Sequence, residues 1–175
     1  MKVFAAADTN PMSWEEYGGA VQALLAKIRN RNRMFDAIAP ILRSGGIPGA
    51  VVAINLKITR IIPLQFKYAH QPVKLVQMLP IPTLPQGMPE SPNILICENN
   101  TSSGDTARAA IALLKKDFPT CKLWYATVAR VFGCPDAFDG VEEILFGIQT
   151  DERFSATPEE TAQLGLRPGI TIFPW

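Results

Sequence analysis

The stretch ILICENNTSSGDTARAA at residues 94–110 runs from an apolar segment through a polar turn into a helix-forming segment. The apolar residues up to Cys97 predict a buried strand, and the spacing of alanine and leucine predicts a helix over 104–117. Gly104 would let the backbone approach a ligand, and the neighbouring hydroxyl groups are hydrogen-bond donors. The start of a helix also presents unpaired N–H groups at its positive end, which suits a phosphate group. A helix cap after a polar turn uses the same residue types, so both interpretations stay open.

Two polar residues, Glu98 and Asn99, precede this turn at the end of the predicted strand. Open α/β sheets bind their ligands at the carboxyl ends of their strands. A carboxylate and an amide at this position could hold a diol or the water molecules around a metal ion.

A second loop, RSGGIPGA at residues 43–50, also joins an apolar run to a predicted helix. The run at 35–42 predicts a strand, although Pro40 is unusual inside a central strand. The paired glycines Gly45 and Gly46 permit backbone angles that expose amide groups to an anion. The helix is expected over 49–56, shortly after Pro48.

The remaining segments alternate between strand and helix patterns over the 175 residues. Ser13 and Glu16 form a capping-box pattern before a helix expected at 14–30. Further strands are expected at 59–66, 121–128, 143–148 and 170–173. The alternation predicts one α/β domain with a mostly parallel central sheet flanked by helices.

Residues 69–92 are rich in proline, with a short strand possible at 75–79. Long loops in compact domains are often active-site lids, and a passive insertion is the equal alternative. The only histidine, His70, falls in this segment, so a histidine-based triad or a histidine-rich metal site is excluded.

The composition narrows the classes of partner. The formal net charge is +1, so no overall field favours nucleic acid or an anionic membrane. The three cysteines are far apart and form no C-x-x-C pair, which indicates a reducing compartment. The first apolar run is too short for a signal peptide, and no stretch could span a bilayer, so a cytoplasmic protein is expected. Neither a P-loop nor a dinucleotide-binding glycine pattern is present.

Taken together, the S-G-G loop and the strand followed by S-S-G-D-T resemble the type I phosphoribosyltransferase family, and most closely its xanthine-guanine enzymes. The similarity extends to Ser13-Trp14-Glu15, to Phe66-Lys67-Tyr68, to Ala129-Arg130 and to the closing segment GITIFP. It implies that family's fold, with a small C-terminal hood at 149–175 that would hold the base. It also implies transfer of 5-phosphoribose from phosphoribosyl diphosphate to a nucleobase, with purine favoured, and a homodimer or tetramer.

The resemblance assigns roles to particular residues. Ser102, Ser103, Gly104, Asp105 and Thr106 would hold the 5-phosphate, and Glu98 and Asn99 the ribose and magnesium (Mg2+), with Glu98 as the metal ligand. The pyrophosphate would lie against Arg43, Ser44, Gly45, Gly46 and Lys67. The base would contact Arg130, Arg153 and Phe154. Glu98, Asn99 and Ser102 are the candidate catalytic residues.

Three departures from the family pattern support a second hypothesis. Asn99 replaces the second of two adjacent acids, and Ser102 stands where many purine enzymes carry an aspartate. Arg43 lies one position earlier than the arginine of the usual R-G-G loop. The alternative is therefore a non-catalytic regulator that binds a nucleotide or phosphoribosyl diphosphate on the same fold. In a third interpretation, the two loops are only helix caps and bind nothing.

Overall fold

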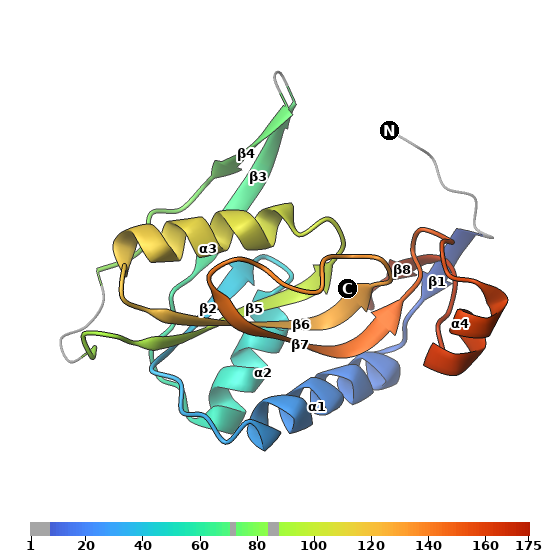
Figure 1. Cartoon of the computed structure of the whole chain (residues 1–175), viewed down its shortest axis with the longest axis horizontal. Helices are drawn as coiled ribbons and strands as arrows, with labels where there is room; N and C mark the ends of the chain where they lie inside the picture. Colours follow the sequence, from blue (N-terminus) through green and yellow to red (C-terminus); the bar gives the residue numbers. More distant parts are fainter. Residues whose placement is uncertain (1–7, 71–72, 84–87) are drawn as a thin grey trace.

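A computed structural model describes residues 8–70, 73–83 and 88–175. Its central sheet has six strands in the order β4-β3-β2-β5-β6-β7 (Figure 1). All neighbours are parallel except β3 and β4. The strands are β2 (Ala37–Leu42), β3 (Leu64–His70), β4 (Val73–Gln77), β5 (Asn93–Thr101), β6 (Lys122–Val131) and β7 (Val141–Thr150). This confirms the expected α/β class and its mostly parallel sheet.

Helices cover both faces of this sheet (Figure 1). Helices α1 (Trp14–Asn30) and α2 (Gly46–Leu56) pack on one face, and α3 (Asp105–Asp117) packs on the other. The central strand β5 separates the two cores, because successive side chains of a strand point to opposite faces. Leu95 and Cys97 join the core beneath α1 and α2, whereas Ile94 and Ile96 join the core beneath α3.

The strand expected at 59–66 is displaced towards the C-terminus. Residues 59–63 make only an isolated bridge, from Ile61 to Ile38, and the strand begins at Leu64, directly after Pro63. It continues to His70 and pairs antiparallel with β4. The segment expected as a long loop at 69–92 therefore begins in a two-stranded arm, and residues 71–72 and 84–87 lie outside the described residues. The arm projects from the sheet (Figure 1).

The last strand does not join the central sheet. Strand β8 (Ile170–Ile172) pairs in parallel with β1 (Thr9–Pro11), a strand that the sequence analysis does not predict. The short helix α4 (Pro158–Leu164) lies beside this pair (Figure 1). The small C-terminal unit thus includes residues from both ends of the described chain.

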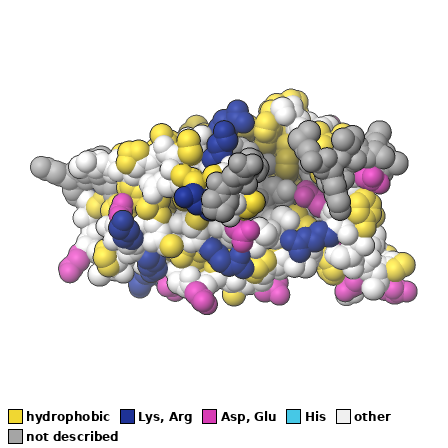
Figure 2. All heavy atoms as spheres, turned by 90° about the horizontal axis from the view of Figure 1, so that it is seen from above, with side chains coloured by type: hydrophobic (Ala, Val, Ile, Leu, Met, Phe, Trp, Pro, Cys, Tyr) yellow, Lys and Arg dark blue, Asp and Glu magenta, His cyan; other side chains and the backbone are white. Residues whose placement is uncertain are grey.

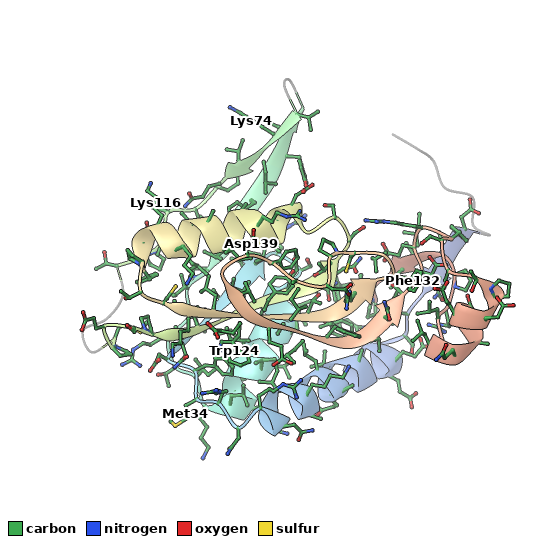
Figure 3. All side chains as sticks on the ribbon, viewed as in Figure 1. Met34, Lys74, Lys116, Trp124, Phe132 and Asp139 are labelled. Carbon is green, nitrogen blue, oxygen red and sulfur yellow. The ribbon has the colours of Figure 1, made fainter. Side chains whose placement is uncertain are left out.

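The surface carries charges of both signs. On the face seen from above, Lys and Arg side chains alternate with Asp and Glu (Figure 2). At the turn after α1, Met34 is 89% exposed and points away from the body of the molecule (Figure 3). No helix within the described ranges is long and apolar enough to cross a membrane.

Candidate functional site

The turn at 102–104 connects β5 to α3 at the carboxyl end of the central strand. Gly104 is the N-cap of α3 and has a left-handed backbone, with φ 79°. A Cβ at this position would lie 2.6 Å from a ring carbon of the buried Phe138. Glycine is therefore required for both the backbone conformation and the packing. Because of this packing, a Gly104→Asp variant would disturb the fold as well as ligand binding.

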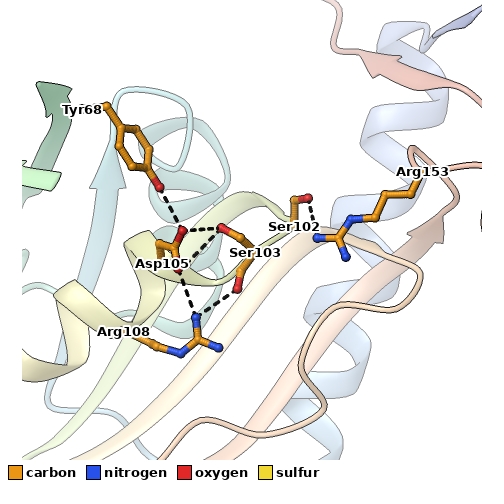
Figure 4. Close-up of polar contacts among 6 residues, drawn as sticks. All are labelled: Tyr68, Ser102, Ser103, Asp105, Arg108 and Arg153. Carbon is orange, nitrogen blue, oxygen red and sulfur yellow. Dashed lines mark hydrogen bonds and ion pairs between the residues drawn. The ribbon is translucent and has the colours of Figure 1, made fainter. Parts of the chain in front are cut away.

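The start of α3 is hydrogen-bonded to the arm (Figure 4). The hydroxyl groups of Ser103 and Tyr68 both donate to Oδ2 of Asp105, at 3.0 Å and 3.3 Å. The Arg108 guanidinium donates to Oδ1 of Asp105 at 3.3 Å and to the Ser103 carbonyl at 3.0 Å. The structure thus brings together two predicted phosphate-binding residues, Ser103 and Asp105, with two that the sequence analysis did not assign.

A second arginine reaches the same turn from the segment after β7. The Arg153 guanidinium donates to Oγ of Ser102 at 3.2 Å (Figure 4). Arg153, expected at the base, therefore lies next to the predicted phosphate loop. Two cations, Arg108 and Arg153, thus lie at the turn, and Arg108 is already paired with Asp105.

Glu98 lies partly buried at the end of β5 and accepts a short hydrogen bond from the Tyr125 hydroxyl. The Tyr125 hydroxyl also lies 2.7 Å from Oγ1 of Thr101. Burial raises the pKa of Glu98 from the usual 4.5 to about 7, although the Tyr125 hydrogen bond acts in the opposite direction. Among the described residues, no group of three or more His, Cys, Asp or Glu side chains could hold a metal ion.

Asn99 is placed differently from Glu98. Its side chain is on the α1 face of the sheet, is 2% exposed, and accepts a hydrogen bond of 3.0 Å from the Tyr17 hydroxyl. The alternation of β5 sends the two neighbouring side chains to opposite faces. The structure therefore does not place Glu98 and Asn99 side by side in one open site.

The loop between β2 and α2 packs against the central strand. A Cβ at Gly45 would lie 2.5 Å from the carbonyl oxygen of Ile41 and 2.7 Å from that of Cys97, so no larger residue fits. The amides of Gly45 and Gly46 donate to the carbonyls of Ile41 and Arg43 at 2.9 Å each. Both amides are therefore used inside the turn, and the expected cradle of free glycine amides does not form.

The side chains of this loop do reach a large cavity. Its volume is about 890 Å³, and it brings Arg43 and Ser44 together with Lys67 of β3, as the sequence analysis expects. Its other walls are Leu42, Ile47, Gln65, Phe66, Met78 and Trp175. Two basic side chains in one cavity are suited to an anionic ligand.

An aromatic cluster that the sequence analysis missed borders this cavity. The Trp175 ring lies 4.8 Å from Tyr17, 5.4 Å from Phe173 and 5.9 Å from Trp14, measured between ring centroids. Trp14 and Tyr17 fit a helical apolar stripe, which predicts burial for both, yet Trp14 is 59% exposed. No local signal in the sequence indicates that the segment at 173–175 meets the start of α1.

The other residues expected at the base are separate from the phosphate turn. Arg130, at the end of β6, forms an ion pair with Asp136 and lies over the Phe146 ring, 5.1 Å from its centroid. Phe154 is 54% exposed and has a left-handed backbone, with φ 54°. The structure thus places Arg130 at the end of β6 and Phe154 on the loop after β7, without a contact between them among the described interactions.

Comparison with solved structures shows which known proteins share this architecture. No family model matches the sequence. A purine phosphoribosyltransferase from Pyrococcus horikoshii is similar in structure, with a TM-score of 0.69 and 20% identity over 96% of this chain and 93% of that chain. A xanthine-guanine-hypoxanthine phosphoribosyltransferase from Helicobacter pylori has a TM-score of 0.64 and 14% identity over 95% and 91%.

A hypothetical protein from Neisseria gonorrhoeae with bound ppGpp is also similar, with a TM-score of 0.72 and 17% identity over 95% of this chain and 89% of that chain. Identities this low show the shared fold alone. On the strength of its sheet order, its flanking helices and these matches, the chain has the type I phosphoribosyltransferase fold.

Proposed function

We propose that this protein transfers 5-phosphoribose from phosphoribosyl diphosphate to a nucleobase of the purine class and releases pyrophosphate. One observation carries the proposal: the Ser102–Gly104 turn follows β5, and the loop that brings Arg43 to the cavity follows β2, the parallel neighbour of β5, so both loops lie at the carboxyl edge of the sheet. Tyr68 follows Lys67 directly and contacts Asp105 at the start of α3, which joins the two regions. An anion-binding turn and a basic cavity suit a ligand that carries a phosphate at one end and a pyrophosphate at the other.

In this proposal the turn at 102–106 holds the 5-phosphate, and Arg43, Ser44 and Lys67 face the pyrophosphate. Catalysis would come from positioning and from offsetting charge as pyrophosphate leaves, with little covalent work by the protein. Magnesium, when bound, would neutralise the leaving pyrophosphate. It usually binds through one or two carboxylates together with substrate phosphates, and Glu98 is the carboxylate that would take part in this proposal.

The base would lie between the phosphate turn, the end of β6, where Arg130 is found, and the loop after β7, which carries Arg153 and Phe154. A purine is proposed because the similar proteins from Pyrococcus and Helicobacter are a purine phosphoribosyltransferase and a xanthine-guanine-hypoxanthine phosphoribosyltransferase. A role in purine salvage, a cytoplasmic location and a homodimer or tetramer complete the proposal.

Pyrophosphate release tests the activity. Purified protein, magnesium and phosphoribosyl diphosphate would be incubated in turn with guanine, xanthine, hypoxanthine, adenine, uracil and orotate. Release that depends on one base establishes the transferase and its acceptor. The absence of release with every base, despite measurable binding of phosphoribosyl diphosphate, would contradict it.

A Ser103→Ala variant tests the phosphate turn without the packing problem of Gly104. Losing one hydroxyl donor to a charged group should weaken ribose 5-phosphate binding about tenfold or more, measured by calorimetry. Ser91→Ala, on an exposed residue outside the turn, is the matched control. Equal affinity in both variants would remove Ser103 from the site.

The second candidate function is a regulator that binds a nucleotide without turnover. Two observations favour it: Asn99 is buried against Tyr17, and the Neisseria neighbour was solved with bound ppGpp. A regulator would bind ppGpp or phosphoribosyl diphosphate in calorimetry and leave the latter unconsumed with every base. Base-dependent consumption would exclude it.

A further inference from the structure

Asp105 places a carboxylate inside the turn that is proposed to hold the 5-phosphate. It is the first residue of α3, directly after the N-cap Gly104. Its side chain is 55% exposed, so it is not held there by burial. It is instead held by hydrogen bonds, and the hydroxyl and guanidinium groups that donate them could equally donate to a phosphate oxygen.

Two hydroxyl donors converge on one oxygen of this carboxylate. The Ser103 hydroxyl belongs to the turn itself, and the Tyr68 hydroxyl comes from the arm (Figure 4). Arg108 donates to the other oxygen of Asp105 from one turn further along α3. An anionic group of the protein therefore already occupies donors that face the turn.

An acid in the first turn of a helix is common, because it interacts favourably with the positive end of the helix dipole. That role accounts for the position of Asp105 at the start of α3. It does not account for Tyr68, which belongs to a strand 37 residues earlier in the chain and bonds the same carboxylate. The contact with the arm fixes the orientation of the carboxylate towards the turn.

A phosphate monoester that enters the turn would bring up to two further negative charges close to this carboxylate. Like charges a few ångströms apart repel, and the repulsion is stronger near a protein surface than in bulk water. The ester must also compete for the hydroxyl group that Ser103 donates to Asp105.

We propose that the carboxylate of Asp105 competes with the phosphoryl group of a ligand for the donors of the turn. This inference rests on the proposed phosphate turn. Tyr68 holds Asp105 in position, and the Asp105 carboxylate lowers the affinity of the turn for phosphate monoesters. Asp105 then determines the affinity of the turn for a phosphorylated ligand, and the arm contributes to this effect because Tyr68 holds Asp105.

Ribose 5-phosphate binding, measured by calorimetry in low salt without magnesium, tests this role. Asp105→Asn keeps the shape and the hydrogen-bond acceptor but removes the charge, and we expect its affinity to be about tenfold higher than that of the wild type. The gain should shrink as salt is added, since salt screens exposed charges. Asp117→Asn removes an acid from the other end of the same helix and should leave the affinity unchanged.

Tyr68→Phe separates the two parts of the proposal. Alone it should raise the affinity about two- to threefold, the effect expected when one modest hydrogen bond no longer orients the carboxylate. Combined with Asp105→Asn it should add nothing. Weaker binding of Tyr68→Phe in both backgrounds would make Tyr68 a ligand contact and overturn its role in holding Asp105.

The outcomes distinguish this inference from the proposed function. Equal binding by the wild type and Asp105→Asn overturns the competitor role and leaves the phosphate turn in place. Failure of both proteins to bind ribose 5-phosphate and phosphoribosyl diphosphate overturns the phosphate turn, and the competitor role with it. Circular dichroism of each variant checks that α3 is still folded.

Discussion

Glu98 is a carboxyl group whose surroundings favour its protonated form. Burial raises its pKa to about 7, and the Tyr125 hydroxyl that donates to it offsets only part of this effect. In the unfolded chain the same group titrates near 4.5. The folded state thus binds this proton more tightly than the unfolded state does, and folding stability depends on pH through this residue.

The sign of that dependence gives a first prediction. The stabilising contribution of protonated Glu98 is complete below about pH 4.5 and is lost as the pH rises through about 7. Relative to Glu98→Gln, the wild type should lose about 2–3 kcal/mol of unfolding free energy between pH 5 and pH 8. Urea unfolding at the two pH values measures it, with Glu90→Gln as an exposed control. Parallel behaviour of wild type and Glu98→Gln would contradict the assignment.

Gly104 provides a second prediction. Gly104→Ala must adopt a left-handed backbone and place a Cβ 2.6 Å from the Phe138 ring, so we expect a loss of about 2–4 kcal/mol. Gly140 has a similar φ of 81°, but the nearest atom to its Cβ would be 3.5 Å away. Gly140→Ala should therefore cost only about 1–2 kcal/mol. Equal losses in thermal unfolding would show that packing on Phe138 is unimportant.

At the scale of elements, helix α1 is the most completely predictable part of the chain. Its predicted range is the observed one, and the Ser13–Glu16 capping box forms as expected. The same pattern, Thr157 with Glu160 and a proline between them, begins α4, which the sequence analysis did not predict. A local signal suffices for such helices because all the residues involved are close in the chain.

The two capping boxes give a third prediction. Ser13→Ala should lower the global unfolding free energy by about 1 kcal/mol, because α1 packs six buried side chains into the core. Thr157→Ala should free the amides of α4 to exchange faster without a comparable global loss, since α4 buries none of its residues. Chemical denaturation and hydrogen exchange distinguish the two. A global loss from Thr157→Ala as large as that from Ser13→Ala would contradict this division.

The sequence predicts where most strands lie, but it does not predict which strands pair with each other. The apolar run correctly predicts β5, which leads into the turn at 102–104 at the carboxyl edge of the sheet. The pairing of β1 with β8, and the bonds from Tyr17 to Asn99 and from Tyr125 to Glu98, join residues far apart in the chain. No spacing rule reveals such contacts, so the roles of Tyr17 and Tyr125 beside Asn99 and Glu98 could not be predicted from the sequence.

At the scale of the whole molecule, the sheet divides the buried residues into two cores; Cys97 lies in one, Cys121 in the other, and Cys134 is buried outside both. Each cysteine is at most 5% exposed, and none forms a disulfide. Burial also raises the pKa of Cys97 to about 12, which keeps its thiol protonated. The fold therefore needs no oxidising conditions.

The fourth prediction concerns these thiols. In the native protein at pH 8 they should react slowly with a thiol reagent, and in concentrated urea all three should react at once. Addition of a reducing agent should leave the unfolding midpoint unchanged. Rapid labelling of the native protein would show that one of the cores opens readily.

The distribution of tryptophan gives the molecule an intrinsic optical reporter. Trp175 forms part of the wall of the cavity that contains Arg43 and Lys67 and lies next to the exposed Trp14, whereas Trp124 is buried beside Phe35 on the strand β6. A ligand that fills the cavity would change the polarity around the first pair and leave Trp124 untouched. Intrinsic fluorescence, compared between wild type and Trp175→Phe, can therefore follow occupation of the cavity without any attached dye.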